Sequence, residues 1–82
     1  MAYVERTDEE IIAAFERNIE KYKSYDLLFM RIDNVWLTAR ETIGALRRGD
    51  SVVTEIVTNF FRNFAKKYDT DPVDYLMNGL KK

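Results

Sequence analysis

The chain contains no cysteine and no histidine. Without cysteine it can form no disulfide and no thiolate site, which suits a reducing compartment such as the cytoplasm. The two absences together exclude the commonest general base, the usual zinc ligands and Ser-His or Cys-His nucleophile pairs. We therefore expect no catalytic residue, no metal ion and no cofactor, and we predict that the protein is not an enzyme.

Glycine and long apolar runs are also scarce. The three glycines, Gly44, Gly49 and Gly79, are too widely spaced for a phosphate-binding loop. No apolar run approaches the roughly 18 residues that a membrane-spanning helix needs, and the first ten residues, "MAYVERTDEE", lack an apolar signal-peptide core. We expect no membrane contact.

Carboxylates are the remaining candidates for chemistry. The segment "DTDPVD" begins like a calcium loop, but Asp74 and Leu80 occupy the positions where such a loop needs glycine and glutamate. We interpret the segment as a turn followed by an acidic helix start. Glu16 and Glu20 lie one helical turn apart and are interpreted as part of a solvated face.

The charge is balanced overall but unevenly distributed. The 13 basic and 14 acidic side chains give a net charge of −1. The first 30 residues carry 7 acidic and 4 basic groups, and the remaining 52 carry 7 acidic and 9 basic groups. Any contact with a polyanion is therefore expected in the later part of the chain.

Capping signals and apolar periodicity predict helices along most of the chain. The 82 residues predict a single domain, with residues 1–6 as a flexible N-terminus. "TDEE" is a capping box in which Thr7 caps a helix that ends near Lys23. Ile12, Phe15 and Ile19 fall on one stripe of that helix.

The segment "SYDLLFMRIDNVWL" is ambiguous, because short dense apolar runs fit either a helix or strands. A helix capped by Ser24 or Asp26 and continuing through Ile32 is one alternative. A hairpin of "LLFMRI" and "VWLT" around Asp33-Asn34 is the other. We favour the helix, because Asp-Asn is a weaker hairpin signal than Asn-Gly or Asp-Gly.

Three more helices are predicted after this segment. Thr38 caps the first in a second capping box, "TARE", and Gly49 ends it. Asp50 or Ser51 caps a long core helix, residues 53–68. Its core-facing stripe recurs at steps of four and three through Val53, Val57, Phe60, Phe64 and Tyr68. Thr70 caps the last, with Pro72 in its first turn and Gly79 at its end. The predicted fold is therefore all-α, a compact bundle of about five short helices.

The arrangement of "TARETIGALRRG" followed by "VVTEIVTNFFRNFAKKYDTDPVDYL" resembles the lambda-repressor-like (Cro/CI-type) helix-turn-helix domains, most clearly over residues 38–76. Arg48-Gly49 is similar to the turn that commonly ends the recognition helix of that family. Thr42-Ile43 is similar to its mid-helix pair. The resemblance implies a small DNA-binding transcriptional regulator whose capped arginine helix enters the major groove of double-stranded DNA.

On that interpretation Arg40 contacts base edges, because a guanidinium can bond guanine bidentately. Glu41 accepts from cytosine, and Gly44 permits close approach of a backbone. Arg47 and Arg48, together with Arg31 from the preceding segment, bind phosphates. One short helix reads few bases, so a homodimer is expected.

The alternative is a helical protein–protein interaction module, inhibitor or adaptor that does not bind DNA. Tyr25, Phe29 and Trp36 all lie in the ambiguous segment or at its edge. So small a core cannot bury every aromatic side chain, so these three form a candidate contact surface for a second copy or another protein.

Overall fold

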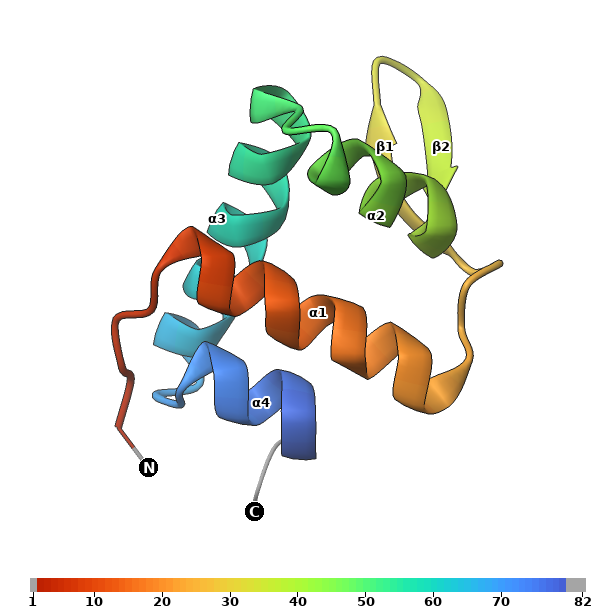
Figure 1. Ribbon diagram of the computed structural model, residues 1–82. Coiled ribbons are helices and arrows are strands. Elements are labelled where there is room, and N and C mark those ends of the chain that lie inside the picture. Colours follow the sequence, from red (N-terminus) through yellow and green to blue (C-terminus); the bar gives the residue numbers. More distant parts are fainter. Residues whose placement is uncertain (1, 80–82) are drawn as a thin grey trace.

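The computed structural model describes residues 2–79 and contains four helices and one β-hairpin within them (Figure 1). The elements in chain order are α1 (Asp8–Tyr22), β1 (Leu28–Ile32), β2 (Val35–Thr38), α2 (Ala39–Arg47), α3 (Ser51–Lys67) and α4 (Pro72–Asn78). α1 runs across the molecule, with α4 packed along one side and α2 and the hairpin on the other (Figure 1).

The hairpin corrects the prediction of a five-helix, all-α fold. β1 and β2 pair antiparallel, with Arg31 opposite Trp36 and Ile32 opposite Val35. The helix predicted through Ile32 is wrong, and the hairpin alternative around Asp33-Asn34 is the observed structure. The physical reason lies in the turn. Asp33 and Asn34 have φ angles of 49° and 68°, and Asp and Asn accept this left-handed backbone more readily than other side chains.

The predicted helix ends are largely confirmed. Thr7 and Thr38 both cap their helices in complete capping boxes, and Gly49, with a φ of 77°, follows the end of α2. Asp50 rather than Ser51 caps α3, where its carboxylate accepts from two backbone N–H groups. The predicted cap at Thr70 is wrong, because Asp71 caps α4.

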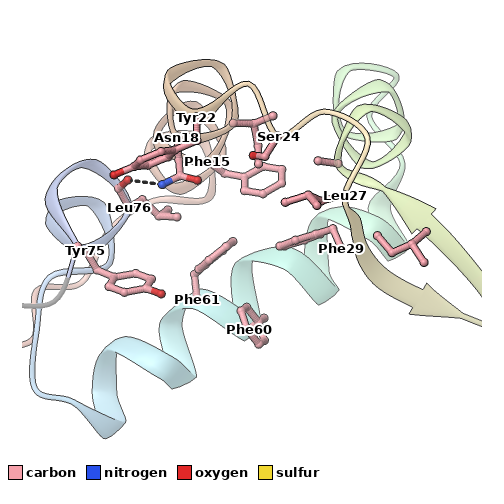
Figure 2. Close-up of a pocket in the computed structure, with 14 residues that line it drawn as sticks. Phe15, Asn18, Tyr22, Ser24, Leu27, Phe29, Phe60, Phe61, Tyr75 and Leu76 are labelled. Carbon is pink, nitrogen blue, oxygen red and sulfur yellow. Dashed lines mark hydrogen bonds between the residues drawn. The ribbon is translucent and has the colours of Figure 1, made fainter.

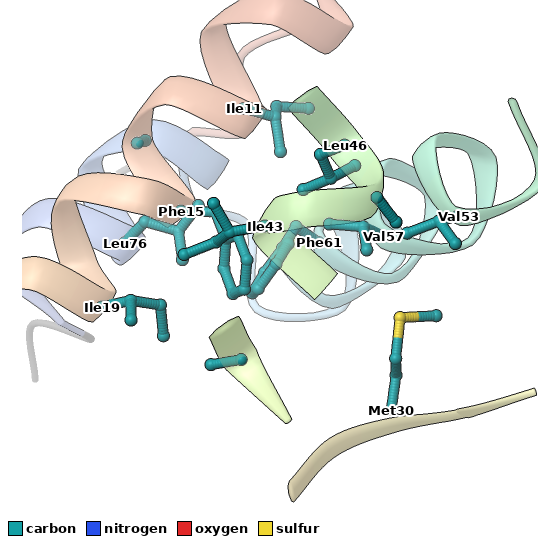
Figure 3. Close-up of a cluster of buried hydrophobic side chains, with 13 residues drawn as sticks. Ile11, Phe15, Ile19, Met30, Ile43, Leu46, Val53, Val57, Phe61 and Leu76 are labelled. Atoms are coloured by element: carbon teal, nitrogen blue, oxygen red, sulfur yellow. The ribbon is translucent and has the colours of Figure 1, made fainter. Parts of the chain in front are cut away.

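The core lies where the helices and β1 meet. Phe15 and Phe61 are almost completely buried and face each other from α1 and α3, with ring centroids 5.7 Å apart (Figure 3). Met30 brings β1 into this cluster, and Leu76 brings α4 into it. Phe60, which the sequence pattern placed on the core stripe, is 55% exposed. The hairpin is therefore anchored to the same core as the helices.

Ion pairs join the N-terminal segment to the junction of α3 and α4. Arg6 donates from Nε and Nη2 to the carboxylate of Asp71, whose side chain is only 11% exposed. Arg62 donates to the backbone carbonyl of Arg6 at 2.8 Å and pairs with Asp8 at 2.7 Å. The hydrogen bonds from the Arg6 guanidinium are the main cause that lowers the pKa of Asp71. They attach residues before α1 to the opposite end of the chain.

Candidate functional site

Two candidate sites were expected, an arginine surface on α2 and an aromatic surface near the hairpin. On α2, Glu41 completes the capping box. Its carboxylate accepts from the Thr38 backbone N–H at 2.9 Å and from the Thr38 hydroxyl at 3.1 Å. The backbone hydrogen bond is the main cause that lowers the pKa of Glu41. This carboxylate is therefore engaged at the start of the helix rather than directed at a partner.

Carboxylates of neighbouring elements lie against two of the candidate arginines. The Arg47 Nε donates to Glu16 of α1 at 3.0 Å. The Arg40 guanidinium lies 5.0 Å from the centre of the Tyr25 ring and 3.7 Å from the Asp26 carboxylate. Both arginine side chains remain mostly exposed, at 74% and 65% respectively. The surface is therefore of mixed charge, not uniformly basic.

The six candidate DNA-contacting residues do not form one cluster. Arg40, Gly44 and Arg47 line a depression of about 690 Å³ between α1 and α2, together with Glu16, Arg17 and Glu20. Arg31 lies on β1, where it donates to the Asn34 side chain at 2.7 Å. Arg48 is the C-terminal cap of α2. Tyr25, a candidate for protein contact, lines the α1–α2 depression instead of the aromatic surface.

Trp36 and Phe29, the other two contact candidates, lie together beside α3. They line a groove of about 290 Å³ with Ile56 and Phe60. The Trp36 side chain is 53% exposed, whereas Phe29 is partly buried against the core. Phe29 and Phe60 meet edge to face with centroids 6.4 Å apart. The sequence thus indicated the hairpin side of this groove, with Phe29 and Trp36, but not the side that α3 supplies.

A second apolar pocket adjoins the first and shares Phe29 and Phe60 with it. It has a volume of about 350 Å³ and lies between α1, α4, α3 and the start of the hairpin. Figure 2 shows Phe15, Phe61 and Phe29 pointing into it from three different elements. Asn18 donates its amide N–H to the Leu76 carbonyl at 2.8 Å (Figure 2), so its polar group is satisfied within the chain.

The two pockets form one continuous apolar surface, which we call the hairpin–α3 surface. It consists of Tyr22, Leu27, Leu28, Phe29, Trp36, Ile56 and Phe60. Six of these seven are among the ten exposed large hydrophobic side chains of the described chain. Among the described residues, Arg31 is the only charged one that lines either pocket. Most of the exposed large apolar side chains of residues 2–79 are thus concentrated on one surface with a single charged residue.

The α3 side of the groove could have been found in the sequence, because the apolar pattern of α3 is wider than one core-facing stripe needs. A single core-facing stripe needs about three apolar residues in seven. α3 carries Val53, Val57 and Phe61 on its buried face and Val52, Ile56 and Phe60 beside it, exposed. The excess marks a second apolar face.

Within residues 2–79 no helix is long and apolar enough to cross a membrane, and no group of three or more acidic side chains could hold a metal ion. No family model, curated protein or solved structure matches this chain.

Proposed function

We propose that the protein is a non-enzymatic protein-interaction module that binds its partner through the hairpin–α3 surface. The observation that carries this proposal is the concentration of six exposed large apolar side chains around two adjoining pockets with a single charged lining residue. Contiguous apolar patches of this kind mark interaction sites, whereas isolated exposed apolar residues are ordinary.

The architecture supports a preformed binding surface. Phe29 packs on Phe15 with ring centroids 4.7 Å apart and on Phe61 at 6.0 Å, so the hairpin side of the surface rests on the core. Aromatic side chains are enriched in protein interfaces, and the residues that contribute most to binding cluster near the interface centre. Trp36 and Phe60 are therefore the residues expected to contribute most to binding.

Photo-crosslinking tests this proposal. A photoreactive benzoylphenylalanine in place of Phe60 is expected to form a covalent protein adduct in the native host. The same group at Val4, an exposed apolar position that lines neither pocket, serves as the control. Adducts at Phe60 and none at Val4 support the proposal, and equal yields at both positions reject it.

DNA binding by α2 is the second candidate function. It is supported by the high exposure of Arg40 and Arg47 on the same depression. It is opposed by Glu16 and Glu20, because carboxylates beside these arginines repel phosphate groups. Fluorescence anisotropy on mixed-sequence duplex DNA, titrated with salt, is the direct test. On this candidate Arg40→Ala changes base preference, while Arg47→Ala and Arg48→Ala weaken binding to all sequences. The cytoplasmic location expected from the sequence stays a prediction.

A further inference from the structure

We infer that the partner of the hairpin–α3 surface is a second copy of this chain, bound about a twofold axis with the two α3 helices antiparallel. This inference rests on the proposed function and adds the identity and orientation of the partner.

Low charge is the first reason for a second copy. In a twofold interface the same surface patch meets itself, so any uncompensated charge on the patch is brought against a like charge. Between Val52 and Asn63 of α3 the only exposed charged residue is Glu55, and Arg31 is the only charged one of the described residues that lines either pocket. The whole chain has a net charge of only −1, so two copies approach without strong repulsion.

The positions of Glu55 and Lys66 fix the antiparallel orientation. Both are exposed on α3 and are eleven residues apart, close to three helical turns of about 3.6 residues each. They therefore lie on the same edge of the helix, one toward each end. In an antiparallel pair the same edges face each other, so Glu55 of one copy meets Lys66 of the other, twice. A parallel twofold pair places this edge of the two helices on opposite sides of the interface, so Glu55 and Lys66 of one copy meet neither residue of the other.

The apolar pockets complement each other in the same orientation. Around Phe60, the groove that holds Trp36 lies toward Ile56, on the N-terminal side of α3. The uncharged pocket of about 350 Å³ lies toward Phe61 and extends to Tyr75 of α4. An antiparallel arrangement centred near Phe60 places the exposed indole of each copy opposite the uncharged pocket of the other.

The exposed apolar area is comparable to the apolar share of such an interface, which is a little over half of its area. Large aromatic side chains bury about 150–250 Å² when fully covered, so the three aromatic and three aliphatic side chains, 40–65% exposed, leave roughly 500 Å² of apolar surface. A standard interface takes about 800 Å² from each partner, and its rim is polar. Asn59, Asn63, Glu55 and Lys66 flank the apolar residues on α3 and supply such a rim.

Analytical ultracentrifugation of the purified full chain, over a concentration series, measures the oligomeric state. The parent chain is expected to be dimeric at micromolar concentration. Trp36→Thr is expected to raise the dissociation constant about 30-fold or more, as loss of a central interface aromatic does. Its matched control is Val35→Thr, because Val35 is the neighbouring residue of β2, is 59% exposed and lines neither pocket. This control is expected to remain dimeric.

Charge reversal tests the orientation without removing apolar contacts. Glu55→Lys and Lys66→Glu are each expected to weaken the dimer several-fold, because each brings like charges together across the axis. The double variant, with both charges exchanged, is expected to restore it. Circular dichroism of each variant checks that the monomer fold is retained. A double variant no tighter than either single variant overturns the antiparallel arrangement.

The fluorescence of Trp36, the only tryptophan, gives an independent reading. Its emission is expected to shift to longer wavelength when the dimer is diluted into monomers. A monomeric parent chain at every concentration, or a dimer that Trp36→Thr leaves unchanged, overturns the inference. If Phe60 also crosslinks in the host to a different protein while the purified chain is monomeric, only the second copy is rejected. If Phe60 forms no specific adduct and the chain is monomeric, the proposed function fails as well.

Discussion

The turn of the hairpin allows the strand structure itself to be tested by stability measurements. Asn34 has a φ of 68°, a left-handed conformation that costs most residues with a Cβ atom about 1–2 kcal/mol. Glycine has no such steric cost. We therefore expect the Asn34→Gly variant to have a higher free energy of unfolding than the Asn34→Ala variant.

The comparison of these two variants isolates the backbone conformation. Both remove the hydrogen bond that the Asn34 side chain accepts from Arg31 at 2.7 Å, so that loss cancels. The steric cost for alanine exceeds its advantage of about 0.4–1 kcal/mol from a less flexible unfolded chain, which leaves a net difference of about 1 kcal/mol in favour of glycine. In a helix the order is reversed, because alanine is about 1 kcal/mol more favourable than glycine.

Urea denaturation followed by circular dichroism measures both free energies, and a difference of about 1 kcal/mol corresponds to about 4–8 °C in melting temperature for a domain of this size. Gly44 provides the control of opposite sign. It lies inside α2, and a Cβ atom built there meets only Arg48 Nη1 at 3.5 Å, so Gly44→Ala is expected to stabilise by about 1 kcal/mol. An Asn34→Ala variant more stable than Asn34→Gly, with the control behaving as expected, refutes the hairpin.

Three further outcomes are expected. Lys23 follows the end of α1 in a left-handed conformation with a φ of 51°. The Lys23→Gly variant should therefore have a free energy of unfolding about 0.5–1 kcal/mol higher than the parent, measured by urea denaturation. Leu76→Ala removes a side chain that is 3% exposed and should cost about 2–5 kcal/mol in the same assay. Asp71→Asn keeps a good N-terminal cap on α4 but loses the negative charge that Arg6 binds. Arg6 lowers the pKa of Asp71 in the folded protein. The stability that this carboxylate adds is therefore complete above its pKa in the unfolded chain, about 3.9, and is lost as the pH falls through its lower pKa in the folded protein. Thermal melts should therefore show the parent more stable than Asp71→Asn at pH 7, with the gap closing in acid below about pH 4; a gap that is independent of pH contradicts this assignment.

Helix ends were predictable from the sequence because their signals are local. A capping box involves only four residues, and the boxes at Thr7 and Thr38 form as expected. At Asp71 two neighbouring residues could both cap the last helix. The local pattern decides between them, because proline prefers the first helical position and Pro72 is the first residue of α4. The residue before it, Asp71, is therefore the cap, and its carboxylate accepts from the Val73 backbone N–H at 2.9 Å.

The hairpin was harder to predict than the helix ends, because neither its turn residues nor the alternation of its two short strands is a strong sequence signal. Asp33-Asn34 is a weak turn signal, and β1 contains a register shift between Leu28 and Met30 that breaks strict alternation. The strands are held by packing. Met30 enters the core formed by the helices, and a two-stranded hairpin without such support is marginal in water. Tertiary burial therefore decided the local structure here.

The same reasoning explains why the sequence identified only Phe29 and Trp36 of the hairpin–α3 surface. Trp36 and Phe29 were singled out as more aromatic surface than so small a core can bury. Phe60 was assigned to the core because it follows Val53 and Val57 at helical steps of four and three, whereas its neighbour Phe61 is the buried one of the two. The periodicity of α3 shows that its apolar residues form two neighbouring rows along the helix, but it does not show which row faces the core. The side chains that pack against Phe61, which are Phe15 of α1 and Phe29 of β1, determine that its row faces inward, and Phe60 of the other row stays 55% exposed. Because the hairpin also places Trp36 beside that row, the element that sequence predicted least well is the one that builds the proposed interface.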